Sequence, residues 1–329
     1  METKPDIVES LLSAAGRRVE PPEEAYREVF AAASAAFREQ AARRRQRRWL
    51  LGTGLAASVA LVVALVTQWP APMPGGRPLA EVERAIGTVE LAVNDSWQPL
   101  EEGRSSLGTG RRIRTRADGR AALALAGGES LRLAVDTEIM LDAPGRIYVE
   151  RGMIYVDSGV RPPAARLEIV TPAGTARDLG TQFELYVAGA ALRLRVREGQ
   201  VAIDRGGQSL TGSAGEQIAI DSLGSISRGV IAPDATAWQW AEAIAPTPDM
   251  DGKPASILIS WVARETGHRL RYESKDAEQR AANVILHGNI RNLPPLAALE
   301  AMLATTDLEC VLSGDTMEIR TRNPRTPEP

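Results

Sequence analysis

The hydrophobic pattern changes its period several times along this chain, and the first clear signal is a long uninterrupted apolar run. Residues 50–68, LLGTGLAASVALVVALVTQ, contain no charged side chain. As a helix rising about 1.5 Å per residue, this run spans roughly 30 Å, which matches the hydrocarbon core of a bilayer. The pattern predicts a single transmembrane helix at residues 49–69.

The flanks of this run predict its orientation. Five arginines lie within residues 43–48, just before the run. Because arginine is retained on the cytoplasmic side, we expect a cytoplasmic N-terminus and residues 70–329 outside the cytoplasm. A cleaved signal peptide is disfavoured because 48 residues precede Trp49, and a buried helix of a soluble protein because an arginine cluster adjoins the run. The predicted membrane anchors are Arg43, Arg44, Arg45, Arg47, Arg48, Trp49 and Trp69.

Residues 1–48 are predicted to form a cytoplasmic helical stub. Two short apolar stripes recur in it at helical spacing, and so short a segment cannot bury both of them by itself. The stub is therefore expected to fold against a partner, with a helix lying along the lipid surface as the alternative. The candidate contact residues are Ile7, Leu11, Leu12, Tyr26, Val29, Phe30 and Phe37.

After a Pro/Gly-rich linker at residues 70–83, the period shortens to two over residues 84–232. In LRLRVR, residues 192–197, apolar and arginine positions alternate strictly, and LRLAVD, residues 131–136, follows the same period. Such strands have one buried and one solvent-exposed face. The pattern predicts an all-β domain.

This β region carries a faint internal repeat. VERGMIYVDSG, residues 149–159, aligns with VREGQVAIDRG, residues 196–206, so that Gly152 matches Gly199. Upstream, Thr137 matches Thr181 with a small change of offset. Two strand-turn-strand units that cover each other's apolar faces would give this pattern, which predicts a solenoid-like stack of strands.

Beyond a connecting helix at residues 233–245, the pattern predicts a small α/β domain at residues 246–321. An apolar helical stretch around residues 257–262 ends at Gly267, and a second helix begins at Pro294. With the strands between them, the expected order is α-β-β-α-β-β, with two helices on one face of a small sheet. Residues 322–329 are predicted to be a disordered tail.

Composition and charge argue against catalysis and nucleic-acid binding. The net charge is −3, and basic residues concentrate beside the apolar run rather than over a folded face. His268 and His287 are the only histidines and Cys310 is the only cysteine, and none stands in a metal-ligand or catalytic spacing. The sequence predicts no enzyme activity, no cofactor, no metal site and no nucleic-acid partner.

Three consecutive motifs in the β region resemble the FecR domain. They are TPAGTARDLGTQFELYV at residues 171–187, LRLRVREGQVAI at residues 192–203 and AGEQIAI at residues 214–220. We interpret the motif positions as structural, with glycines at tight turns and one phenylalanine in the core. They are Thr171, Gly174, Gly180, Thr181, Phe183, Glu198, Gly199, Val201, Gly215 and Glu216.

The C-terminal segment VILHGNIRNLPPLAALEAMLATTDLECVLSGDTMEI, residues 284–319, is similar to the STN module shared by secretins and TonB-dependent transducers. In that family the module is a protein-interaction domain. The tandem order, a FecR-like domain followed by an STN-like module, supports both resemblances.

Together the two resemblances imply a mainly β regulator of anti-sigma-factor type that crosses the inner membrane once, with periplasmic C-terminal domains. Its partners would be the lipid bilayer, an extracytoplasmic-function sigma factor bound by the stub, and a TonB-dependent outer-membrane transducer or another periplasmic protein, as in iron-uptake signalling. The alternative is a membrane-tethered periplasmic scaffold that binds glycan or protein and regulates no sigma factor.

Overall fold

The computed structural model describes residues 78–94, 96–100, 102–103, 106–159, 167–291 and 293–322, all within Gly75–Pro329, the second of two compact units of the chain. In these ranges no helix has both the length and the apolar character needed to cross a membrane. The predicted stub, transmembrane helix and most of the predicted linker and tail lie outside them.

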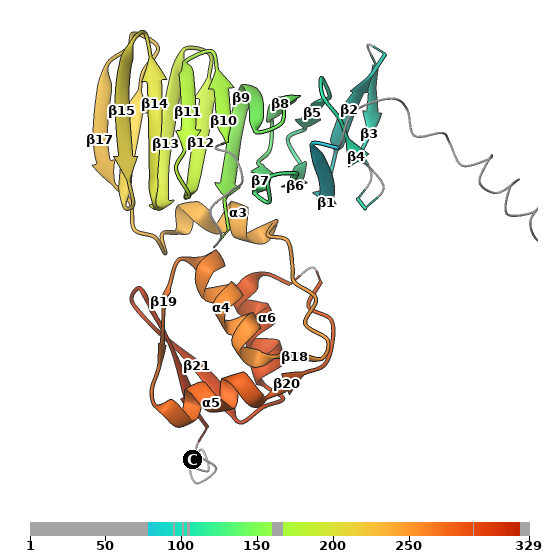
Figure 1. Ribbon diagram of the computed structural model, residues 1–329, viewed down its shortest axis with the longest axis vertical. Helices are drawn as coiled ribbons and strands as arrows, with labels where there is room; N and C mark the ends of the chain where they lie inside the picture. The colour runs from blue at the N-terminus through green and yellow to red at the C-terminus, as the bar shows by residue number, and fades with distance from the viewer. Residues whose placement is uncertain are drawn as a thin grey trace, which may run out of the picture. The chain divides into compact units, whose positions relative to one another are not determined.

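The N-terminal part of the described chain is a β domain of 17 strands (Figure 1). They are β1 Ala80–Ile86, β2 Val89–Val93, β3 Ser96–Pro99, β4 Ser106–Leu107, β5 Arg112–Thr115, β6 Arg120–Leu125, β7 Ser130–Leu133, β8 Glu138–Ala143, β9 Arg146–Asp157, β10 Glu168–Thr171, β11 Gly174–Asp178, β12 Gln182–Ala188, β13 Ala191–Glu198, β14 Gln200–Arg205, β15 Gln208–Ser213, β16 Glu216–Ile220 and β17 Ile226–Val230.

These strands form two layers that share one apolar core. Layer A has the order β4-β1-β6-β7-β9-β12-β13-β16-β17. Layer B has the order β3-β2-β5-β8-β9-β10-β11-β14-β15. Strand β9 belongs to both layers, because it bends at Gly152, where φ is +100°.

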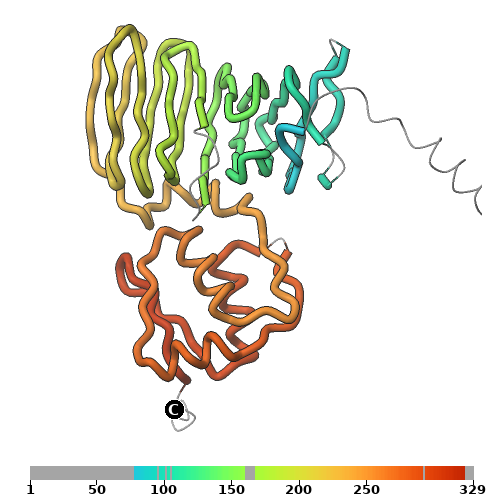
Figure 2. The backbone as a smooth tube through the Cα atoms, in the orientation of Figure 1, coloured from blue at the N-terminus to red at the C-terminus, as the bar shows by residue number. Residues whose placement is uncertain are grey.

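From β10 onward, consecutive hairpins alternate between the layers, β10–β11 and β14–β15 in layer B and β12–β13 and β16–β17 in layer A. Each hairpin pairs with the preceding hairpin of its own layer, β11 with β14 and β13 with β16. The tube in Figure 2 shows these hairpins stacked side by side. Consecutive hairpins thus cover each other's apolar faces, as the sequence pattern predicts.

The internal repeat is visible in three dimensions, with the two layers exchanged. A Cβ on Gly152 would lie 2.4 Å from the Cα of Thr137, and a Cβ on Gly199 would lie 3.2 Å from the Cα of Thr181. The strand segment before Gly152 pairs in layer B, whereas the strand before Gly199 pairs in layer A. Equivalent units therefore alternate between layers, and each glycine allows the chain to cross from one layer to the other.

The alternation predicted for the strands holds for the apolar positions but not for every arginine. Leu131 and Leu133 of β7 and Leu194 of β13 are fully buried, as expected. Arg132 and Arg197, predicted on the wet face, are only 1% and 3% exposed. That prediction is wrong for these two side chains, because the C-terminal part of the chain packs on this face of layer A.

The linker boundary also differs from the prediction. Strand β1 begins at Ala80, inside the predicted linker at residues 70–83, because Leu79, Ala80 and Val82 are buried in the β-domain core.

The C-terminal module follows a short helical connection, η1 Thr236–Trp238 and α3 Gln239–Ala243. Its helices are α4 Ala255–Thr266, α5 Lys275–Asn283 and α6 Pro295–Leu303. Its strands are β18 Lys253–Pro254, β19 Arg269–Tyr272, β20 Ile285–Leu286, β21 Leu308–Ser313 and β22 Thr316–Thr321. They form a three-stranded sheet of order β19-β22-β21 and a β18–β20 pair.

The predicted module order lacks one helix, α5. Its sequence KDAEQRAAN buries only Ala277 and Ala281, so it has no stripe of large apolar residues to reveal it. The hydroxyl of Ser274 caps its first turn by accepting a hydrogen bond from the Ala277 amide at 3.2 Å. The observed module therefore has three helices where the pattern predicts two.

Candidate functional site

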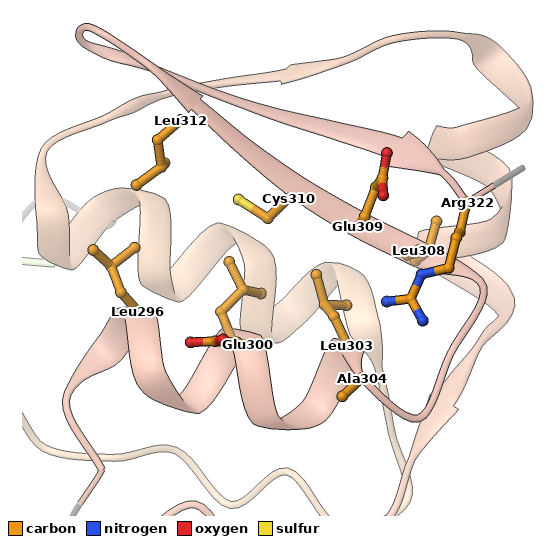
Figure 3. A pocket seen from close by; sticks show the side chains of 10 residues that line it. Leu296, Glu300, Leu303, Ala304, Leu308, Glu309, Cys310, Leu312 and Arg322 are labelled. Carbon is orange, nitrogen blue, oxygen red and sulfur yellow. The ribbon is translucent and has the colours of Figure 1, made fainter. Parts of the chain in front are cut away.

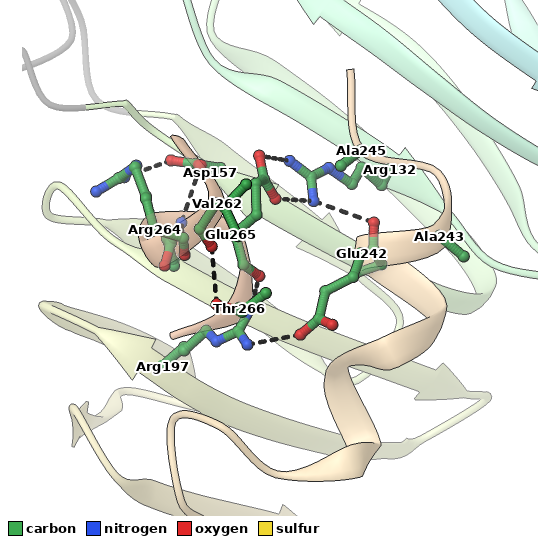
Figure 4. Close-up of polar contacts among 12 residues, drawn as sticks. Arg132, Asp157, Arg197, Glu242, Ala243, Ala245, Val262, Arg264, Glu265 and Thr266 are labelled. Carbon is green, nitrogen blue, oxygen red and sulfur yellow. Dashed lines mark hydrogen bonds and ion pairs between the residues drawn. The ribbon is translucent and has the colours of Figure 1, made fainter. Parts of the chain in front are cut away.

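Three arginines join the β domain to the C-terminal module, and the most buried pair is Arg132 with Glu265. The guanidinium of Arg132, from β7, donates to both carboxylate oxygens of Glu265, from α4, at 2.7 and 2.8 Å. The two side chains are 1% and 5% exposed (Figure 4). Burial alone would lower the pKa of Arg132, but the charge and hydrogen bonds of Glu265 raise it overall.

Arg197, at the end of β13, holds three segments of the connection together. It donates to the backbone oxygens of Pro233 and Glu265, each at 2.6 Å, and to the carboxylate of Glu242 in α3 at 2.8 Å. A Cβ on Gly267 would lie 2.1 Å from the Pro233 oxygen and 2.6 Å from Nε of Arg197. Gly267 thus ends α4, with φ at +70°, and also leaves room for this contact.

Arg264 of α4 reaches back to the ends of two β-domain strands. It bonds to Asp157 of β9 and donates to Glu198 of β13 at 2.8 Å, and the Gln182 amide donates to Asp157 at 2.9 Å. Burial pushes the pKa of Asp157 upward, but the hydrogen bond and charge of Arg264 outweigh it and lower the pKa below its usual range.

An aromatic pair fills the centre of the junction. The rings of Tyr155 and Trp238 are both fully buried and meet edge to face, with centroids 6.1 Å apart. The Trp238 indole donates to the Ala232 oxygen at 2.9 Å, and the Trp240 indole donates to Glu184 at 2.9 Å. The Tyr155 hydroxyl has no partner among the described residues, and burial raises the pKa of Tyr155 to about 12.

The junction bonds connect the β domain to the C-terminal module. Each of the three arginines donates to carboxylate or backbone oxygens of a facing segment. Among the residues that the structure describes, no cluster of metal-ligating side chains occurs. Buried, hydrogen-bonded ion pairs favour one relative orientation of the elements that supply them. The junction therefore holds the module against layer A.

A second feature is an open groove of about 420 Å³ in the C-terminal module, between α6 and β21 (Figure 3). Its floor is apolar, and Leu296 and Leu312 stand 38% and 45% exposed at its sides. Strand β21 is an edge of the three-stranded sheet. The charged groups at the rim are Glu300, Glu309 and Arg322. Such a groove beside an open edge suits an extended peptide segment.

Cys310 lies in this groove as an apolar lining residue. Burial raises the pKa of its thiol to about 11, so the thiolate is scarce at neutral pH. The two histidines have other partners: His268 contacts the Thr266 hydroxyl at 2.8 Å, and His287 contacts Asp251 at 3.2 Å.

The predicted motif residues occupy bends, layer crossings and the core. Gly180, Gly199 and Gly215 have φ of +94°, +78° and +81°, and Phe183 and Val201 are fully buried. Glu198 bonds to Arg264 of the module. The remaining motif positions make local hydrogen bonds or turns, and they are Thr171, Gly174, Thr181 and Glu216.

The predicted stub contacts and membrane anchors lie outside the described residues. The junction residues Arg132, Arg197 and Glu265 were missed by sequence reasoning. The sequence carries no signal for them, because an arginine that alternates with apolar residues is the ordinary pattern of a strand with one solvent-exposed face.

No curated protein matches this chain. Two crystal structures of a candidate anti-sigma factor from Parabacteroides distasonis are similar at 15% and 16% identity, with TM-scores of 0.35 and 0.36. They cover 64% and 63% of this chain and 98% and 97% of their own. TM-scores this low do not establish a common fold.

A family match covers the middle of the chain and ends at residue 202, before the C-terminal module. The STN-like assignment of that module therefore stays a prediction. Residues 111–202, which run from β5 into β14 and include Arg132, Asp157 and Arg197, match the family described as FecR protein, and the FecR resemblance predicted from the motifs is confirmed for that segment.

Proposed function

We propose that this chain is a single-pass regulator of the inner membrane that controls a sigma factor in response to a binding event in the periplasm. The observation that carries the proposal is the FecR match at residues 111–202, in a chain whose apolar run at residues 50–68 follows five arginines. Under this proposal the stub acts in the cytoplasm, and the β domain and the module act in the periplasm.

The junction supports a relay in which the β domain and the module respond as one body. Arg132, Arg197 and Arg264 bond across it, and the first two are nearly inaccessible to water. A partner that binds the module would therefore act on the β domain without a loose hinge between them. This role is binding and transmission, and it requires no bond-making chemistry by the chain itself.

The groove between α6 and β21 is the place we propose for the periplasmic partner. The expected ligand is an extended segment of a TonB-dependent transducer or another periplasmic protein, paired to the edge of β21. Main-chain bonds to the edge would give affinity, and apolar side chains between Leu296 and Leu312 would give selectivity. The exposure of those two leucines and the position of β21 at an edge of the three-stranded sheet support this placement.

Co-purification of the full chain with its cognate sigma factor tests the cytoplasmic half of the proposal. The wild-type chain should retain the sigma factor, and Leu11→Asp or Phe30→Asp in the stub should release it. Leu312→Asp in the module is the matched control and should retain it. If the wild-type chain forms no complex, the sigma-factor role is wrong, and the membrane-tethered scaffold becomes the better description.

Reporter fusions test the orientation. A periplasm-active reporter fused after residue 329 should be active, and a cytoplasm-active reporter at the same position should be silent. The reverse result would contradict the proposed topology.

A further inference from the structure

The β domain ends in an unmatched step between its two layers. Layer A ends at β17 and layer B at β15, and each strand pairs on one side only within the part of the chain that the structure describes. A Cβ on Gly212 of β15 would lie 3.0 Å from Leu194 of β13 and 3.4 Å from Ile218 of β16. Strand β15 therefore faces the space between β13 and β16, and β17 projects beyond layer B.

The inner face of the projecting strand carries two exposed apolar side chains, Ile226 and Val230, with the exposed Arg228 between them. In β17, Ile226 pairs with Ile220 and Arg228 pairs with Ile218. Directly paired residues share a face of the sheet, and both isoleucines of β16 point into the core. Ile226 therefore points toward the layer B side, as does Val230, yet they are 45% and 92% exposed. A terminal strand that exposes large apolar side chains on its inner face is typical of an interaction edge.

The free edge of β15 carries at least one carbonyl that a partner strand could use. The Thr211 oxygen points away from β14 and accepts hydrogen bonds from the Arg228 guanidinium at 3.2 and 3.3 Å. Arg228 also pairs with the partly exposed Glu216 at 3.5 Å, so in a joint its guanidinium would leave the Thr211 oxygen and keep Glu216 as its partner. A strand placed beside β15 would supply a backbone donor instead.

We propose that two copies of the chain join end to end at this step, with β17 of each copy beside β15 of the other. The step is self-complementary, because the layer that projects in one copy meets the layer that is one strand short in the other. The two strands have five and six residues, so their edges match in length. Joining them would cover Ile226 and Val230 of both copies and continue both layers across the joint.

The strand directions fix the symmetry of this joint. Strands β15 and β17 end at the same side of the domain, since the Ile231 amide after β17 bonds to the oxygen of Gly215 after β15. A two-fold axis parallel to the strands places β17 of one copy alongside β15 of its partner in the same direction. The two new strand pairs are therefore parallel, and an isologous dimer results.

Sedimentation of the full chain in a mild detergent tests the joint. The wild-type chain should show a concentration-dependent dimer, and Ile226→Glu should raise the dissociation constant of that dimer at least about tenfold. Ile257→Glu on α4 is the matched control, because Ile226 and Ile257 are both 45% exposed. A wild-type chain that stays monomeric would overturn the proposal. Arg228 would then be a charged residue that keeps this edge from pairing with another chain. Equal effects of the two substitutions would also overturn it.

Cross-linking identifies which strands meet. In a Cys310→Ser background, chains carrying Ser227→Cys on β17 are mixed with chains carrying Ser209→Cys on β15, and a short bismaleimide is added. Both new cysteines lie on outer faces, so the mixture should give a cross-linked dimer and neither variant alone should. Cross-linking of Ser227→Cys with itself would show β17 beside β17 and would refute the proposed joint.

Discussion

Replacing Glu265 with alanine would leave the guanidinium of Arg132 buried without its counter-charge. The two side chains are 1% and 5% exposed and share two hydrogen bonds of 2.7 and 2.8 Å. Breaking a buried pair of this kind costs about 3–5 kcal/mol, because the remaining charge cannot return to water. One bond from Arg132 to the Ala241 oxygen, at 3.1 Å, would remain and cannot neutralise the charge. We therefore expect Glu265→Ala to lower the free energy of unfolding by about that amount.

The double variant Arg132→Met/Glu265→Leu separates charge from packing. Apolar side chains of similar size remove both desolvated charges, so the double variant should be far more stable than Glu265→Ala and close to the wild type. Urea unfolding of the full chain in mild detergent, followed by tryptophan fluorescence, to which the buried Trp238 contributes, compares the wild type, Glu265→Ala and the double variant. Arg269→Ala, which removes an exposed pair with Asp315, is the control and should change little.

The reasoning fails if Glu265→Ala unfolds no more easily than the Arg269→Ala control. It also fails if the loss in the double variant equals the sum of the losses of Arg132→Met and Glu265→Leu measured singly, because a coupled pair must deviate strongly from additivity.

Three further predictions concern other parts of the molecule. The carboxylate of Asp157 has a lowered pKa, so its contribution to stability is present above its unfolded pKa of about 3.9 and is lost as the pH falls through the lower folded pKa; thermal unfolding should depend more weakly on acid pH in Asp157→Asn. Gly199→Ala should destabilise more than Gly215→Ala in thermal unfolding, because both have positive φ but a Cβ at Gly199 would lie 2.5 Å from the Gly180 oxygen, against 3.8 Å from the nearest atom at Gly215. Equal losses would contradict that steric reason. Leu312→Asp should weaken binding of the periplasmic partner by at least about tenfold in calorimetric titration and leave the melting temperature unchanged, because this side chain is 45% exposed.

Much of the local structure could be predicted because it depends on period and on turn residues. The alternation around Leu194 identifies a half-buried strand, and Gly267 ends α4 as its position indicates. The aligned pair Gly152 and Gly199 predicts equivalent crossings, since each position requires a positive φ and a close neighbouring threonine. These features are encoded within short stretches of sequence.

The junction could not be predicted in the same way, since it depends on which faces meet in the folded chain. Arg132 and Glu265 are 133 residues apart, and neither position departs from an ordinary strand or helix pattern. An arginine on the outer face of a strand looks solvated until another element is known to cover it. Helix α5 was missed for a related reason, because two buried alanines give almost no periodic signal.

The junction bonds have a mechanical consequence. The bonds of Arg132, Arg264 and Arg197 reach β7, β9 and β13, three different strands of layer A, near the ends of those strands rather than along one edge. A pull on the C-terminal module would therefore load several strands along their length at once. Rows of ladder bonds would have to yield together instead of opening one after another, so the β domain should resist traction from the module better than it resists peeling from its free edge.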